Sequence, residues 1–124
     1  MMKICFLVTI ALLCSATSNA QLNVVGNGGE MNVDTSLFPP RMQDAYVLMK
    51  QKCGKCHTIE RVIVSVQTGH CSLTKSPFTK DTAKSVITRM LLKPDSNMTR
   101  SEAKTILELI NYMLDQNSNL AEKF

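Results

Sequence analysis

Apolar residues recur at the three- and four-residue spacing of an amphipathic helix in three stretches of this chain. The first stretch begins at Pro39-Pro40, because proline suits the first turn of a helix. Its apolar face comprises Met42, Ala45, Tyr46, Met49 and Cys53. The pattern therefore predicts a helix from Pro39-Pro40 to about residue 53.

The second and third stretches carry end signals as well as apolar faces. Thr79 is placed to cap a helix over residues 80–93, which Pro94 ends. Thr99 and Glu102 form a capping box that opens a last helix, which we expect to end near Asn117. The apolar faces are Ala83, Val86, Ile87, Met90 and Leu91 in one helix, and Ala103, Ile106, Leu107, Ile110, Met113 and Leu114 in the other. With no strand pattern in competition, the fold class is predicted to be all-α, with three main helices.

Two segments lack this periodicity. Residues 21–38 contain Gly26, Gly28 and Gly29, and we interpret them as an extended or flexible N-terminal arm. Residues 58–78, punctuated by Gly69 and Pro77, read as one long loop. A loop of this length is unusual in a small domain unless it has a task of its own, and wrapping a cofactor would be such a task.

The first twenty residues, MMKICFLVTIALLCSATSNA, predict a secretory signal peptide that is cleaved after Ala20. Lys3 gives the positive start, and the apolar run from Ile4 to Cys14 is shorter than the roughly 20 residues that a membrane span needs. A lipoprotein signal with Cys14 acylated fits less well, because Leu13 stands where a small residue is preferred. We therefore expect a soluble, exported chain with an arm at 21–38 and a domain at 39–124.

Cleavage changes both the charge and the cysteine count. Losing Lys3 leaves thirteen Lys and Arg against ten Asp and Glu, a net charge of +3 instead of +4. The basic residues are scattered without interleaved aromatics, so we expect no nucleic-acid partner. Cys53, Cys56 and Cys71 remain, and this odd, small number argues against a disulfide framework.

The sequence Cys53-Gly54-Lys55-Cys56-His57 offers three kinds of chemistry. Thiol–disulfide exchange usually accompanies a strand–helix–strand pattern, whereas this motif ends a helix in an all-α chain. A zinc site could use Cys53, Cys56, His70 and Cys71, but the side chains of neighbours 70 and 71 diverge and export exposes thiols to oxidation.

Covalent haem attachment is the third chemistry and agrees best with the other observations. The Cys53 and Cys56 thiols would add across the two vinyl groups of one haem, and His57 would bind the iron as the proximal ligand. In bacteria this attachment occurs after export, which matches the signal peptide. We expect one covalent haem c, wrapped by the helices and the long loop.

The residue on the other side of the iron has several candidates. Met90 lies on the apolar face of the 80–93 helix, Met98 in the following turn, His70 in the long loop and Met113 on the last helix. A methionine on such a face usually belongs to the core, so spacing alone leaves the choice open. Methionine in this position raises the reduction potential and histidine lowers it.

Residues 39–114 resemble a monohaem class I cytochrome c, and VITRMLLKPDSNMTRSEAKTILELI is similar to a bacterial periplasmic subgroup of that family. The subgroup has an Arg-Met pair, a Lys-Pro-Gly-Ser-Gly turn and then a helix, and its methionine is the axial ligand. The resemblance therefore implies Met90 as the distal iron ligand. Here Asp95 replaces the usual glycine, and Phe78 stands where tryptophan is expected.

The resemblance implies a periplasmic electron-transfer protein without enzyme activity of its own, acting as a monomer that docks transiently with redox partner proteins. Lys50, Lys52 and Lys55 could steer acidic partners toward the haem, although a solvated helix face is the simpler interpretation. Two other functions remain open. One is a haem-based ligand-binding or sensor module with an open or labile sixth position, and the other is the haem subunit of a larger redox enzyme.

Overall fold

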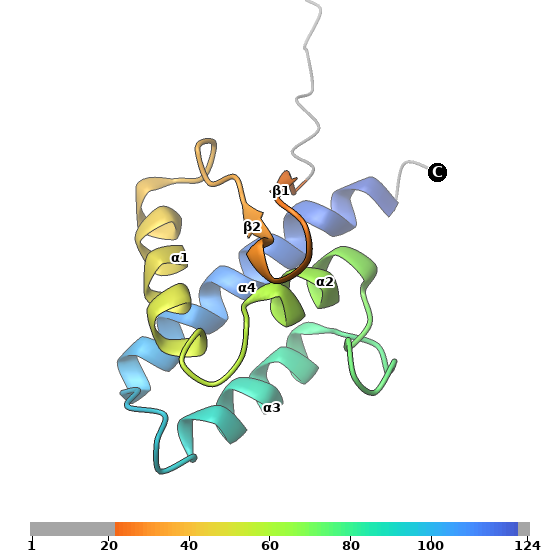
Figure 1. Cartoon of the computed structure of the whole chain (residues 1–124). Coiled ribbons are helices and arrows are strands. Elements are labelled where there is room, and N and C mark those ends of the chain that lie inside the picture. The colour runs from red at the N-terminus through yellow and green to blue at the C-terminus, as the bar shows by residue number, and fades with distance from the viewer. Residues whose placement is uncertain (1–21, 122–124) are drawn as a thin grey trace, which may run out of the picture.

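Four α-helices and one short β-hairpin form the part of the chain, residues 22–121, that the computed structural model describes (Figure 1). The hairpin pairs β1 (Val24–Val25) antiparallel to β2 (Asn32–Val33) around a short 3₁₀ helix, η1 (Gly28–Glu30). The helices are α1 (Pro40–Cys53), α2 (Glu60–Thr68), α3 (Lys80–Leu91) and α4 (Arg100–Ala121). The described residues are therefore mainly helical, as the periodicity predicts.

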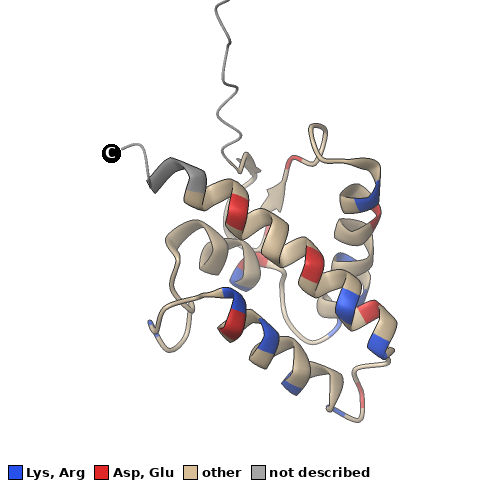
Figure 2. Cartoon of the chain, turned by 180° about the vertical axis from the view of Figure 1, so that it is seen from behind, with Lys and Arg blue, Asp and Glu red and all other residues tan. Residues whose placement is uncertain are grey.

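Helix α4 lies at the centre and packs against α1, α2 and α3 (Figure 1). Its side of the core consists of the buried residues Ala103, Ile106, Leu109, Ile110 and Met113. Three ion pairs link it to its neighbours at the surface: Arg41 of α1 to Glu108, Lys52 of α1 to Glu102 at 3.3 Å, and Lys80 of α3 to Asp115 at 2.7 Å. Figure 2 shows acidic and basic residues interspersed over the face of the molecule that Figure 1 hides.

The starts of α3 and α4 follow the predicted signals, whereas their ends differ from the prediction. The Thr82 amide donates to Thr79 Oγ1 at 3.3 Å, which caps α3. At α4 the Thr99 amide donates to Glu102 Oε2 at 2.8 Å and the Glu102 amide to Thr99 Oγ1 at 3.1 Å, so the capping box is confirmed. Helix α3 ends at Leu91 rather than at 93, because the residue before a proline avoids the helical conformation. Helix α4 continues past Asn117 to Ala121.

The prediction of one long loop over residues 58–78 is wrong, because α2 occupies its first half. Ile59, Ile63 and Val66 lie at helical spacing and are buried, but β-branched residues between them disguise the period. Gly69, with φ +69°, ends the helix in the left-handed conformation that glycine adopts readily. Asn117 of α4 donates to the last carbonyls of α2, at 2.9 and 3.1 Å.

A flexible arm would stand apart from the helices. Residues 22–38 instead pack against them. Leu22 and Val33 are buried in the common core, and the hairpin lies against α2. The Val33 amide donates to the Tyr46 hydroxyl of α1 at 2.8 Å. Gly26 permits the turn, since its φ is +84° and a Cβ there would lie 2.5 Å from the Glu30 carbonyl oxygen.

The expected signal peptide, residues 1–20 with Cys5 and Cys14, lies outside the described residues. Within residues 22–121, every helix is too short or too polar to cross a bilayer.

We predict that Tyr46→Phe lowers the stability of the chain. The substitution leaves the buried Val33 amide without its acceptor, which costs roughly 1–3 kcal/mol. Thermal unfolding followed by circular dichroism should show a lower Tm than for the unsubstituted chain. The control is Tyr112→Phe. The Tyr112 ring packs edge-to-face on Phe38 with the ring centres 5.0 Å apart, and phenylalanine keeps that contact. Equal Tm values for the two variants would contradict the prediction.

Candidate cofactor-binding site

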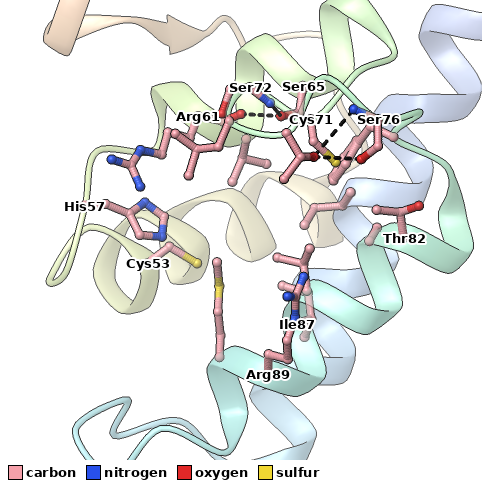
Figure 3. A pocket seen from close by; sticks show the side chains of 18 residues that line it. Cys53, His57, Arg61, Ser65, Cys71, Ser72, Ser76, Thr82, Ile87 and Arg89 are labelled. Carbon is pink, nitrogen blue, oxygen red and sulfur yellow. Dashed lines mark hydrogen bonds between the residues drawn. The ribbon is translucent and has the colours of Figure 1, made fainter.

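A pocket of about 450 Å³ opens between the end of α1, α2, the 69–78 loop and α3 (Figure 3). Its walls are mostly apolar and include Val62, Phe78, Ala83, Val86, Ile87 and Ile110. A volume of this size lies within the range of roughly 300–1,000 Å³ that is typical of cofactor pockets. Phe78, the residue where tryptophan is expected, is buried and forms part of the wall.

The two cysteines of the motif differ in exposure. Cys53 is the last residue of α1, is only 6% exposed and lines the pocket. Cys56 lies in the turn that follows, is exposed and does not line the pocket. Burial raises the pKa of Cys53 from an ordinary value of 9.0 to about 11, and the nearby Cys56 adds to the shift. The Cys53 thiol is therefore neutral at physiological pH.

His57 lines the same pocket, and Figure 3 shows its ring on the same side of the opening as Cys53. Its Nδ1 lies 2.9 Å from the Thr58 carbonyl oxygen. A carbonyl oxygen can only accept, so in this hydrogen bond Nδ1 carries the proton and the Nε2 lone pair is available. Histidines that bind metals are usually fixed in this way, through the ring nitrogen that faces away from the metal.

Of the four candidates for the second axial position, Met90 lines the pocket with Cys53 and His57. Met113 is fully buried in the core, and Met98 is partly buried against the core. His70 is exposed, with its Nδ1 2.9 Å from the Thr68 carbonyl oxygen. None of these three side chains lines the pocket. Met90 is therefore the one of these four candidates that lines the same pocket as His57.

One wall of the pocket is built by residues that the sequence does not single out. Ser65 of α2 is buried, donates from Oγ to the Arg61 carbonyl at 2.7 Å and accepts from the Ser72 amide at 3.2 Å (Figure 3). The loop is closed on itself by the Cys71 amide, which donates to the Ser76 carbonyl at 2.7 Å. The helical spacing of α2 is the signal that could have placed Arg61, Val62 and Ser65 on the pocket side.

Cys71, the third cysteine, is partly buried and also lines the pocket. No three His, Cys, Asp or Glu side chains within residues 22–121 lie close enough together to hold a metal ion between them. The zinc site considered for Cys53, Cys56, His70 and Cys71 therefore has no preformed ligand set in the described part of the chain.

Two of the three lysines near the motif have contacts of their own. Lys52 pairs with Glu102 and donates to the Asn97 carbonyl at 2.7 Å. The Lys50 ammonium lies 5.9 Å from the centre of the Tyr46 ring, within the range of a cation–π contact. Lys52 is held by this ion pair and hydrogen bond, so its charge is not free to attract an acidic partner together with Lys50 and Lys55.

The residues fit a flat, largely apolar cofactor held at one edge by thiols and at its centre by two axial ligands. Cys53 supplies a thiol at the pocket wall, with Cys56 close by in the next turn. His57 offers an available ring nitrogen and Met90 a thioether sulfur in the same apolar space. A nitrogen and a thioether together are a usual ligand set for an electron-transfer haem.

We predict that the cofactor-free chain loses stability between about pH 9 and pH 11 because of Cys53. The pKa of this thiol is about 11 when folded against 9.0 normally, so the unfolded chain releases its proton first as the pH rises. Its contribution is complete below pH 9 and is lost as the pH passes 11. Urea unfolding at several pH values should show this loss, and Cys53→Ala should reduce it. An equal loss in Cys53→Ala would contradict this origin, and Cys71→Ala is the control.

Comparison with known proteins places the chain in no established group. No protein-family model, no curated protein and no solved structure matches it. The function is therefore inferred from the motif, the pocket and the side chains that line it.

Proposed function

We propose that this chain is a periplasmic electron-transfer protein that carries one covalently attached c-type haem and has no enzyme activity of its own. The observation that carries the proposal is the shared pocket of Cys53, His57 and Met90. These residues come from the end of α1, the following turn and the end of α3, and they line one mostly apolar pocket. A Cys-x-x-Cys-His motif alone would leave the second axial ligand undefined.

Each residue has a defined role in this proposal. The Cys53 and Cys56 thiols would hold the haem through thioethers, formed when each S–H adds across a vinyl double bond. His57 would bind the iron through Nε2 while Nδ1 donates to the Thr58 carbonyl. Met90 would bind it from the other side. When bound, the haem supplies one-electron chemistry by cycling between ferric and ferrous iron.

The protein would contribute fixed ligands and apolar walls. Fixed axial ligands keep the structural change between oxidation states small, and apolar walls shape the reduction potential. The His57 ring is held by its own neighbour, while the α3 backbone that bears Met90 packs against α4. These features favour a carrier over a catalyst.

Export fits the same proposal. The signal peptide expected at residues 1–20 would deliver the chain to the compartment in which bacterial haem attachment takes place. A shuttle needs small, weakly held interfaces, so we propose a monomer that docks transiently with redox partners.

A ligand-binding or sensor module is the second candidate, and the position of Met90 is the observation that favours it. Met90 is only partly buried and stands next to the last residue of α3, and helix ends open more easily than helix centres. A sixth position that opens would bind carbon monoxide in the reduced protein without denaturant. A carrier with a fixed ligand would not.

The first test is the absorption spectrum of the protein made together with the haem-attachment machinery. We expect sharp α and β bands after reduction, from a haem that stays with the chain under denaturing conditions. Replacing both Cys53 and Cys56 by alanine should remove the covalent haem, whereas Cys71→Ala should retain it. A colourless wild-type protein would refute the proposal.

We predict that Met90→Ala abolishes the long-wavelength charge-transfer band that a methionine ligand gives to ferric haem. It should also lower the reduction potential and allow carbon monoxide to bind, because the sixth position is then open. Met98→Ala is the matched control and should keep the band, since Met98 does not line the pocket. Survival of the band in Met90→Ala would show that another residue is the ligand.

A further inference from the structure

Two arginines from different helices line the candidate haem pocket. Arg61 belongs to α2 and Arg89 to α3, and both side chains are exposed to solvent. In Figure 3 the Arg89 side chain extends away from the α3 ribbon into the opening, and Arg61 lies on the side of His57. The two positive charges therefore border a mostly apolar pocket from separate walls.

Neither guanidinium has a hydrogen-bond or ion-pair partner within residues 22–121. Arg41, by contrast, pairs with Glu108 on the outer surface. Lys75, another basic residue of this region, donates to the Ser72 carbonyl at 3.0 Å and does not line the pocket. The pocket thus combines an apolar interior with two unpaired planar cations, which is a suitable arrangement for an apolar ligand with an anionic edge.

We propose that Arg61 and Arg89 bind the two propionate carboxylates of the haem, one from the α2 wall and one from the α3 wall. This inference rests on the proposed function, because it names the residues that would hold the anionic edge of the same cofactor.

General electrostatics predicts a measurable effect of this arrangement. Guanidinium and carboxylate match as planar, bidentate partners, and their hydrogen bonds are stronger than those between neutral groups. Two cations beside the haem favour the less positive, ferrous state over the ferric state. Loss of either arginine should therefore lower the midpoint potential, and loss of both should lower it further.

The test uses the full chain, made together with the haem-attachment machinery, in the variants Arg61→Gln, Arg89→Gln and the double variant. Arg100→Gln is the control, because Arg100 is exposed at the start of α4 and does not line the pocket. We expect a lower midpoint potential in each pocket variant, the largest shift in the double variant and no shift in the control. In the wild type, NMR should show nuclear Overhauser contacts between arginine Nε–H protons and the propionate methylene protons.

The two proposals fail in different ways. A wild-type chain without covalent haem refutes the proposed function before the arginines are tested. A haem-bearing chain without Nε–H contacts to the propionates overturns the arginine proposal and leaves the carrier function intact. A double variant with the midpoint potential of the wild type overturns it as well.

Discussion

The apolar face of α4 is the constraint on which the rest of the structure depends. Ile106 and Leu109 are inaccessible to solvent in the centre of the molecule, and α1, α2 and α3 all pack against this helix. Ile110 belongs to the same face and also lines the cofactor pocket. The helix that organises the core therefore also sets the distance between the two walls that bear His57 and Met90. A substitution that shifts α4 would alter stability and the site together.

The fold could be predicted where local signals were strong. The Thr99–Glu102 capping box and the Thr79 cap predict where two helices begin, because cap residues act within one helical turn. Helix α2 was not predicted, because a short stretch rich in β-branched residues does not distinguish a helix from a strand. The hairpin was not predicted either, because it depends on a distant partner, the Tyr46 hydroxyl of α1.

The same division runs through the candidate site. Cys53 and His57 are four residues apart, so the motif alone predicts that they belong to one site. Met90 is distant in sequence, and a methionine on an apolar helix face is ambiguous until packing decides which cavity it meets. Arg61 and Arg89 could not be paired from sequence at all, because one lies in the helix that periodicity missed. Only the packing of the helices shows that these distant residues line one pocket.

Asn117 shows how far the domain extends along its last helix. The apolar stripe of α4 is complete by residue 114, yet the Asn117 amide donates to the Val66 and Gln67 carbonyls at the end of α2. A side chain of one helix thus satisfies carbonyl groups at the end of another, whereas such groups are usually satisfied by residues adjacent in sequence. The domain therefore extends along α4 beyond Met113, the last buried residue among those whose burial the structure describes. A chain shortened to residue 114 would leave the end of α2 without these hydrogen bonds.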